Sequence, residues 1–276
     1  MSSIRDDLRS PVDATALNMA AFPTDSHPGV DSEDDARDEM EGMREQLFDL
    51  HEMMFAGEEQ RVLLVLQGLD ASGKNGTIKH VVGLLNPAGV SVASFTEPTG
   101  EEKQQHFLER VGSRVPDPGS LGVFDRSHYE DLLVPLATGS ETHDVLDRRF
   151  QEVIDFERDL IDGGTVVVKC VLHISYDEQR RRFLRRLRRD DKRWKFAESD
   201  LDTRKLWDEY QAAYGEVVAR TSRPGAPWYI VPSDHKWYRN WAIARILLET
   251  FRDMDLAYPQ PALDVEALIL RLQPPA

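Results

Sequence analysis

The stretch Gly68-Leu69-Asp70-Ala71-Ser72-Gly73-Lys74 decides the fold, because Gly-x4-Gly-Lys is the spacing of a Walker A phosphate-binding loop. A continuous apolar run that favours a buried strand, residues 61–67, precedes it, and a helix is predicted at 74–85. The glycines let several backbone N–H groups face one phosphate at a helix start, where Lys74 can reach the terminal phosphates. The alternative is a merely structural turn, which this strand–loop–helix context disfavours.

Two residues depart from the usual loop. Asn75 follows the lysine, where Ser or Thr ordinarily binds Mg²⁺ through its hydroxyl group. Asp70 places a carboxylate beside bound phosphates, which is repulsive unless a metal ion or a proton lies between them. We therefore predict that Asp70 binds Mg²⁺ or orients a phosphate acceptor, with a turn-stabilising Asx role as the alternative.

A second motif, Phe124-Asp125-Arg126-Ser127-His128-Tyr129-Glu130-Asp131, contains a candidate partner for Asp70. Asp125 ends a short apolar strand predicted at 121–124, as a Walker B aspartate does. Ligands of open α/β sheets bind beyond the carboxyl ends of the strands, so Asp70 and Asp125 should approach each other there. Two carboxylates with Mg²⁺ suit phosphoryl transfer, in which catalysis is mostly positioning and charge neutralisation.

The other polar residues of this motif have open roles. Arg126 either clamps a phosphate or forms a structural ion pair, and Glu130 and Asp131 either sense the acceptor or cap the next helix. His128 is not favoured as a general base, because a phosphate acceptor is already ionised.

Alternation of strands and helices predicts the architecture. Further strands are expected at 90–95, 121–124, 165–174 and 227–231, separated by helices that include 101–111, 144–161, 202–220 and 237–251. This pattern predicts a three-layer α/β fold with a central parallel sheet and helices on both faces. Together with the phosphate-binding loop it resembles the P-loop kinase fold, and kinases of this architecture carry a helical lid over the phosphates. We expect a flexible or draped N-terminal arm at 1–30, the kinase domain at 31–256 with its lid at about 176–200, and a C-terminal tail at 257–276.

Charge is distributed unevenly along the chain. The net charge of −15 argues against nucleic acid as a partner, yet residues 180–195 contain ten basic and two acidic residues. That window carries +8 and the rest of the chain −23. Arginine pairs with phosphate bidentately, so the segment is predicted to be a lid that binds a polyanion longer than a nucleotide triphosphate. The alternatives are a solvated charged helix face or a nucleic-acid patch.

Three further features concern compartment and membrane. The single cysteine, Cys170, lies in an apolar run and is expected to be a buried strand residue rather than a nucleophile. No apolar run approaches the roughly 18 residues of a membrane span, and no secretory signal is visible. We expect a cytoplasmic protein without a membrane partner.

Several separated motifs, in the same order, resemble the type-2 polyphosphate kinases over residues 36–249. They are Gly68-x-Asp70-Ala71-Ser72-Gly73-Lys74-x-Gly76-Thr77-Ile78-Lys79, Asn86-Pro87-x-Gly89, Phe124-Asp125-Arg126-Ser127-His128-Tyr129-Glu130-Asp131, Glu178-Gln179-x-x-Arg182-Phe183, Trp194-Lys195-Phe196, Trp207-x-Glu209-Tyr210, and Pro227-Trp228-Tyr229 before Asp234-x-Lys236-Trp237. The absence of Ser or Thr after Lys74 is a trait of that family.

The resemblance implies a thymidylate-kinase-like fold and reversible, Mg²⁺-dependent phosphoryl transfer between inorganic polyphosphate and AMP, ADP or ATP. It implies that Asp70 and Asp125 are metal-binding and catalytic, with Lys74 and Arg126 as further catalytic residues. A homodimer or homotetramer is also implied. The remaining expected contacts to nucleotide or phosphate are Gly68, Ala71, Ser72, Gly73, Asn75, Gly76, Lys79, Glu130, Arg182 and Arg186.

The acceptor stays open between AMP and ADP. The residues His128-Tyr129-Glu130-Asp131 resemble the branch that phosphorylates AMP and often ADP, whereas Asp125 resembles the ADP-preferring branch. Two other functions are an ATP-dependent small-molecule kinase of the same fold and a non-catalytic sensor of nucleotide or polyphosphate. The missing Walker hydroxyl and the excess lid charge disfavour the first, and the presence of Lys74, Asp70 and Asp125 together disfavours the second.

Overall fold

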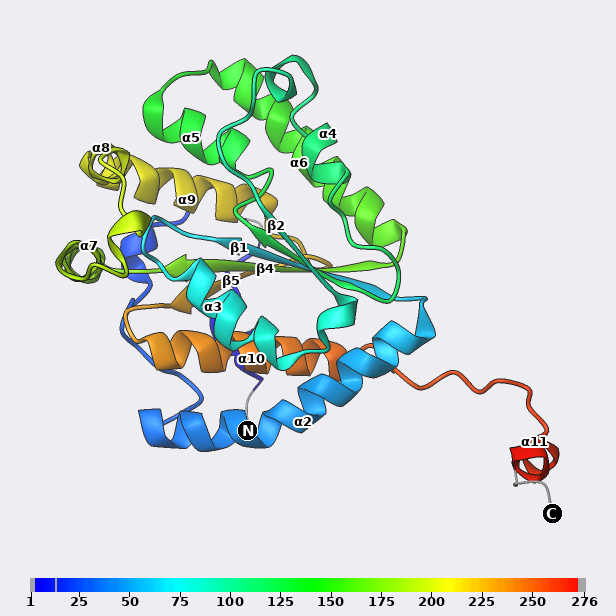
Figure 1. The fold of residues 1–276 in the computed structure, drawn as a ribbon. Helices are drawn as coiled ribbons and strands as arrows, with labels where there is room; N and C mark the ends of the chain where they lie inside the picture. The colour runs from blue at the N-terminus through cyan, green and yellow to red at the C-terminus, as the bar shows by residue number, and fades with distance from the viewer. Residues whose placement is uncertain (1–2, 13, 273–276) are drawn as a thin grey trace.

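Figure 1 shows a parallel sheet between two layers of helices, in a computed structural model that describes residues 3–12 and 14–272. The sheet order is β2-β3-β1-β4-β5, and every pair of neighbours is parallel. This confirms the predicted three-layer α/β fold. Because β1 and β3 are neighbours, the loops that follow them meet at one edge of the sheet. The strands are β1 Arg61–Gln67, β2 Val90–Ser94, β3 Leu121–Asp125, β4 Thr165–His173 and β5 Trp228–Pro232.

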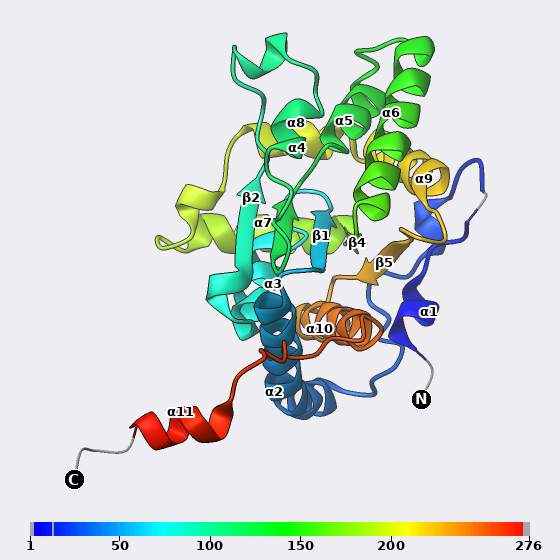
Figure 2. The same ribbon diagram turned by 90° about the vertical axis from the view of Figure 1, so that its right-hand side faces the viewer.

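Helices cover both faces of the sheet, as both ribbon views show (Figures 1 and 2). A hydrophobic core lies on each face of the sheet, and β1 contributes side chains to both. Leu64 and Leu66 pack into one hydrophobic cluster, and Leu63 and Val65 pack into the other. The continuous apolar sequence of β1 is therefore explained by burial on both faces. One layer contains α2 Glu33–Gly57, α3 Lys74–His80 and α10 Lys236–Arg252; the other contains α5 Glu130–Thr138, α6 His143–Asp162 and α9 Trp207–Thr221.

Short elements complete the chain. The predicted lid, residues 176–200, contains α7 Tyr176–Arg188, a 3-10 turn Arg193–Lys195 and the start of α8 Ser199–Lys205. The tail leads to α11 Val265–Leu272, which projects away from the domain in both ribbon views (Figures 1 and 2). No helix in the described part of the chain combines the length and the apolar character of a membrane span. The remaining elements are α1 Ile4–Leu8, α4 Glu109–Gly112 and the 3-10 turns Met19–Ala21, Val82–Leu84, Pro87–Gly89 and Glu102–Gln104.

The N-terminal segment, expected to be a flexible or draped arm, lies along the domain in residues 3–12 and 14–30. Ile4, Leu8 and Met19 are buried, and the backbone N–H of Ser10 donates to the carbonyl oxygen of Trp228 at 2.8 Å. Ile4 and Leu8 are one helical turn apart on α1, but so short a pattern does not predict a packed segment, and only the surface that these side chains cover reveals their role.

Several helices differ from those expected. The helix expected at 101–111 is a 3-10 turn followed by the single turn α4, and the helix expected at 202–220 is divided at Leu206. Helix α5 was not expected as an element of its own. It contains Pro135, which discourages a helical interpretation of a short sequence.

Candidate active site

The loop between β1 and α3 has the backbone of a phosphate-binding turn. Gly68, Ala71 and Gly73 have φ angles of 145°, 66° and 120°. The ammonium group of Lys74 folds back over the loop, where its Nζ donates to the carbonyl oxygen of Gly68 at 2.7 Å. Lys74 is only 8% exposed, and its burial lowers the pKa of the ammonium group. The loop therefore holds a partly desolvated cation beside its own backbone.

Gly73 is a position where only glycine fits. A Cβ atom there would lie 1.9 Å from Nη1 of Arg239, and φ is 120°. We expect Gly73→Ala to destabilise the fold by about 2 kcal/mol or more and to weaken phosphate binding, because both the loop and Arg239 must move. Thermal denaturation and polyphosphate titration of the full chain measure these effects.

Gly42 is the matched control for this substitution. It is exposed in α2, and a Cβ atom there would meet nothing within 4 Å. Gly42→Ala is expected to raise stability by roughly 0.5–1 kcal/mol without changing phosphate binding. Equal behaviour of the two variants would contradict the close fit at Gly73.

Strand pairing brings the two candidate carboxylates into one cavity. Asp125 is the register partner of Leu66 near the end of β1, so the loop after β3 lies against the phosphate-binding loop. Asp70 and Asp125 both line a cavity of about 730 Å³. Asn75, which replaces the usual hydroxyl residue, donates its amide to Oδ2 of Asp125 at 3.4 Å.

Arg126 joins the two loops. Its φ is 65°, in the left-handed region, and its Nη2 donates to Oδ1 of Asp70 at 2.9 Å. Its Nη1 lies 3.8 Å from Oε2 of Glu130, at the start of α5. Burial alone would lower the pKa of Arg126, but the carboxylates of Glu130 and Asp70 outweigh it and raise that pKa, so the guanidinium stays charged. Burial raises the pKa of Glu130, against the effect of Arg126.

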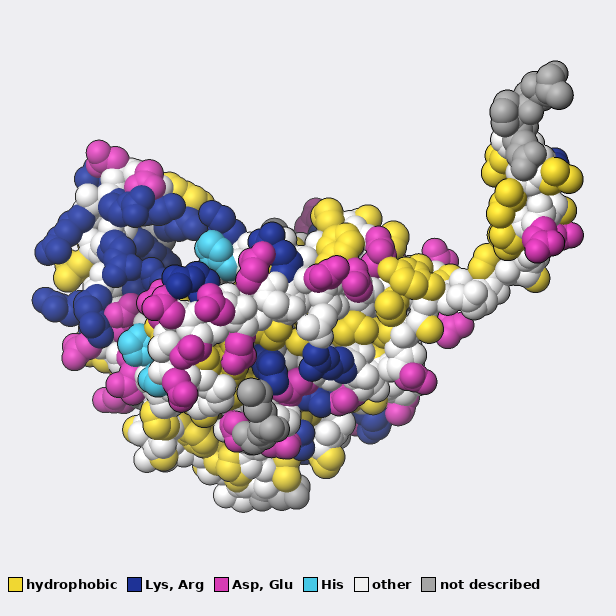
Figure 3. Space-filling view, turned by 90° about the horizontal axis from the view of Figure 1, so that it is seen from below, with side chains coloured by type: hydrophobic (Ala, Val, Ile, Leu, Met, Phe, Trp, Pro, Cys, Tyr) yellow, Lys and Arg dark blue, Asp and Glu magenta, His cyan; other side chains and the backbone are white. Residues whose placement is uncertain are grey.

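Positive charge dominates the cavity. Its described lining includes eleven Lys and Arg side chains and three carboxylates, from the phosphate-binding loop, α3, the end of β3 and the loop after it, α7, residues 189–195, α8 and α10. Figure 3 shows Lys and Arg gathered at the left end of the molecule, the end where Figure 1 places α7 and α8. Such a lining attracts polyanions and exceeds what one triphosphate requires. Asn75, Gly76, Lys79 and Arg186 also line this cavity, and their contacts to phosphate stay predictions.

Arg182, expected to contact polyphosphate, lines the cavity but has a second role. It is only 6% exposed and its donors are used within the protein. Nη1 donates to the carbonyl oxygens of Ala71 and Ser72 at 2.9 and 2.7 Å, Nη2 donates to Ser233 and Asp234, and Nε donates to Glu178. Arg182 thus braces the phosphate-binding loop, because it lies on the face of α7 that packs against the domain. Arg186 is less enclosed: Nη1 donates to the carbonyl oxygen of Lys195 at 3.0 Å.

Arg239, on α10, is a site residue that the sequence did not single out. It is 2% exposed and lines the cavity beneath the loop, where its Nη1 donates to the carbonyl oxygen of Ser72 at 3.3 Å. Burial, together with nearby Arg182, lowers its pKa to about 9. Among the described residues no carboxylate lies within ion-pair distance of it. The signal in the sequence was Lys236-x-x-Arg239 just after the strand at 228–232, a position where ligands bind.

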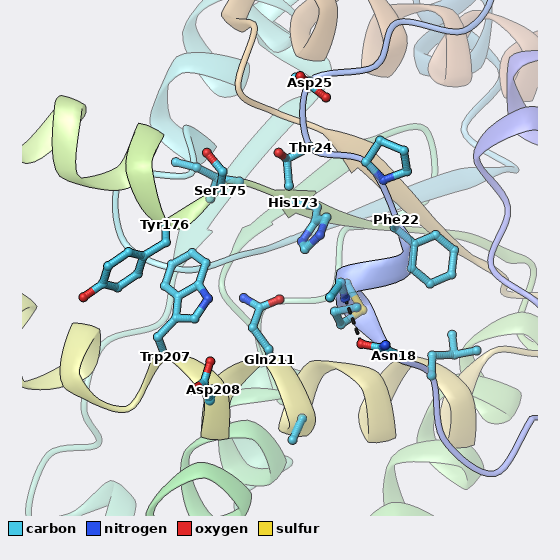
Figure 4. Close-up of a pocket in the computed structure, with 16 residues that line it drawn as sticks. Asn18, Phe22, Thr24, Asp25, His173, Ser175, Tyr176, Trp207, Asp208 and Gln211 are labelled. Carbon is cyan, nitrogen blue, oxygen red and sulfur yellow. Dashed lines mark hydrogen bonds between the residues drawn. The ribbon is translucent and has the colours of Figure 1, made fainter.

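A second cavity, of about 710 Å³, lies between the N-terminal segment and α9 (Figure 4). Figure 4 places Trp207 beside Tyr176, and Gln211 and His173 near the middle of the group of lining residues. The described residues that line it include Asp25 and Asp208 but no Lys or Arg. This lining does not suit phosphate, so the phosphate chemistry belongs to the first cavity.

Several residues considered from the sequence lie in the core instead. His128 is fully buried, and its Nε2 lies 3.4 Å from Oε1 of Glu157, so it is not placed to act on a substrate. Cys170 is buried in β4, as predicted, and Trp228 of the Pro227-Trp228-Tyr229 motif is a core residue.

Comparison with known proteins gives one consistent result. The family model described as Polyphosphate kinase 2 (PPK2) matches residues 30–259. An AMP/ADP-polyphosphate phosphotransferase of Meiothermus ruber is 45% identical over 221 residues, 80% of this chain and 83% of that protein. An ADP-polyphosphate phosphotransferase of Rhodopseudomonas palustris is 35% identical, over 93% of this chain and 94% of that protein. The crystal structure of Polyphosphate Kinase 2 from Arthrobacter aurescens TC1 superposes with a TM-score of 0.93 at 36% identity, over 98% and 97% of the two chains.

Proposed function

The chain belongs to the polyphosphate kinase 2 family and is an enzyme of phosphoryl transfer between polyphosphate and nucleotides, and we propose that AMP and ADP are its acceptors and Mg²⁺ its cofactor. The observation that carries the proposal is the continuity of one cavity, in which the phosphate-binding loop and the cationic segment of α7 face the same space. A long polyanion can occupy the basic part while its terminal phosphate lies at the loop. The name of the Meiothermus ruber relative supports both acceptors.

The carboxylates Asp70 and Asp125 suit the metal that this family requires. Their oxygens are the hard ligands that Mg²⁺ prefers, and Mg²⁺ in kinase sites is bound by one or two carboxylates together with phosphate oxygens. Within the part of the chain that the structure describes, Oδ2 of Asp125 accepts a single long hydrogen bond, from Asn75, which leaves lone pairs accessible. When bound, Mg²⁺ would neutralise charge on the phosphoryl group in transfer and relieve the repulsion between Asp70 and phosphate.

The side chains divide into a donor side and an acceptor side. We assign the loop N–H groups, Lys74 and Arg239 to the last phosphates of polyphosphate, and the cations of α7 to phosphates further along. Arg126, held between Asp70 and Glu130, is assigned to the acceptor phosphate. An acceptor oxygen attacks the terminal phosphorus, and the bridging P–O bond of polyphosphate breaks. The acceptor oxygen is already ionised, so no buried base such as His128 is needed.

The transfer is proposed to be reversible, because the bond broken and the bond formed are both phosphoanhydrides. A homodimer or homotetramer and a cytoplasmic location stay predictions.

One assay tests the proposal. The purified full chain is incubated with polyphosphate, Mg²⁺ and either AMP or ADP, and nucleotides are resolved by chromatography. We expect ADP and ATP to form from AMP, and ATP from ADP, and both to stop on addition of EDTA and resume with excess Mg²⁺. Failure to form product from polyphosphate would contradict the activity, and product only from ATP as donor would favour an ordinary kinase. Turnover of ADP alone would restrict the acceptor.

A further inference from the structure

A buried polar cluster lies beneath the loop that carries Asp125 and Arg126. At its centre is Lys169 of β4, which is fully buried. Its Nζ donates to Oε2 of Glu157 at 2.6 Å, to the carbonyl oxygen of Thr221 at 2.9 Å and to the hydroxyl oxygen of Tyr129 at 3.1 Å. All three donors of the ammonium group are therefore used.

Glu157 of α6 connects this lysine to the loop. Its Oε1 accepts a hydrogen bond of 2.6 Å from the hydroxyl group of Tyr129, and Nε2 of His128 lies 3.4 Å from the same oxygen. Tyr129 and His128 are fully buried, and the Tyr129 ring packs edge-on against Trp228 with centroids 4.8 Å apart. None of these residues lines the phosphate cavity.

The cluster ends where the active-site loop needs support. Tyr129 lies between Arg126, which holds a left-handed backbone, and Glu130, which contacts the Arg126 guanidinium. A side chain other than glycine persists in that conformation only when its surroundings impose it. A buried ion pair is a poor source of stability compared with apolar packing of the same volume, so its value here lies in directing hydrogen bonds to the loop.

We propose that Glu157 and Lys169 are positioning residues for the acceptor side of the active site. They anchor Tyr129, and the anchored loop fixes the directions of Arg126 and Glu130. The donor side has a separate brace, since Arg182 donates to the carbonyl oxygens of Ala71 and Ser72 in the phosphate-binding loop. The assignment of the two sides rests on the proposed function.

The sharpest variant is Tyr129→Phe, which removes only the hydroxyl group that both Glu157 and Lys169 contact. Small displacements of catalytic groups cost up to about 10²-fold in rate, so we expect kcat/KM for the nucleotide acceptor to fall by about 10- to 100-fold. The KM for polyphosphate should stay within about twofold of the wild-type value, because the donor side is braced independently. This split between substrates is the readout that a merely structural role would not produce.

A second variant guards against loss of folding. Glu157→Gln alone would leave the buried ammonium group of Lys169 without its carboxylate partner and so destabilise the fold. The double variant Glu157→Gln/Lys169→Met removes both charges and keeps a similar side-chain volume. It should fold and show the same acceptor-specific loss. Val153→Ala is the matched control: Val153 is fully buried on the same helix four residues earlier and packs in the apolar core. It should lower the melting temperature while leaving the KM for both substrates unchanged.

Calorimetric titration of each full-length protein with ADP and with polyphosphate, in Mg²⁺, completes the test. We expect Tyr129→Phe and the double variant to weaken ADP binding and to leave polyphosphate binding unchanged. Equal losses for both substrates, or the same acceptor loss in Val153→Ala, would overturn the positioning role. If the wild-type protein binds both ligands yet transfers no phosphate, the proposed function is wrong. The positioning role is then still tested by comparing how tightly the wild-type protein and the variants bind ADP and polyphosphate.

Discussion

Asp70→Asn is expected to lower polyphosphate-dependent phosphoryl transfer by about 10³-fold or more, since catalysis of this reaction depends on charge neutralisation. The substitution keeps the shape of the side chain but removes the charge that would hold a metal ion beside the phosphates. The fold should remain, because Asp70 is partly exposed and its backbone carbonyl still accepts a hydrogen bond from Gln179 at 3.0 Å. Initial rates with ADP and circular dichroism measure the two properties.

Asp200→Asn is the control for this prediction. Asp200 is a carboxylate of the same cavity, 3.8 Å from Arg186 on the lid side, and has no assigned part in the transfer. We expect its rate to stay within about threefold of the wild-type rate, as for most contacts between partly exposed charges. A near-normal rate in Asp70→Asn would show that the metal assignment is wrong. An equal loss of rate in both variants would show that any carboxylate of the cavity contributes through its charge, without a specific metal site at Asp70.

Lys74→Met is expected to lower the transfer rate by about 10³-fold without loss of stability, because it removes a preorganised cation from a desolvated site. Burial lowers the pKa of Lys74, so the charged form is disfavoured in the folded protein relative to the unfolded chain at neutral pH. Removing that charge should leave the melting temperature unchanged or raise it, because a buried charge that serves activity lowers the stability of the fold. Rates and thermal denaturation are measured on the same preparation.

The control for Lys74→Met is Lys205→Met. Lys205 is exposed on α8 and pairs with Asp202 of the same helix. This variant should keep both rate and stability. If Lys74→Met instead unfolds the protein, the lysine is a structural residue of the loop rather than a phosphate ligand.

The strands could be predicted because their signals are local. Residues 62–66, just before the loop, are all apolar, as a strand buried on both faces requires, and Asp125 follows an apolar run in the same way. The shared cavity of Asp70 and Asp125 then followed from a general property of parallel sheets.

The parts that escaped prediction depend on contacts between distant segments. Arg182 and Arg186 occur in the same run of arginines, yet only docking of α7 decides that the first faces the loop carbonyls. Arg239 needs the fold to bring α10 beneath the loop. Lys169 occurred within a run of valines, and its partner Glu157 belongs to another element, so neither signalled a buried pair.

The most direct test follows the phosphoryl group itself. Polyphosphate labelled with ³²P is incubated with the purified chain, Mg²⁺ and unlabelled AMP or ADP. We expect the label to enter the β-phosphate of ADP formed from AMP and the γ-phosphate of ATP formed from ADP, and neither labelled product to form at a comparable rate with Asp70→Asn. Absence of label from the nucleotides with active wild-type protein, or undiminished labelling by Asp70→Asn, would contradict this expectation.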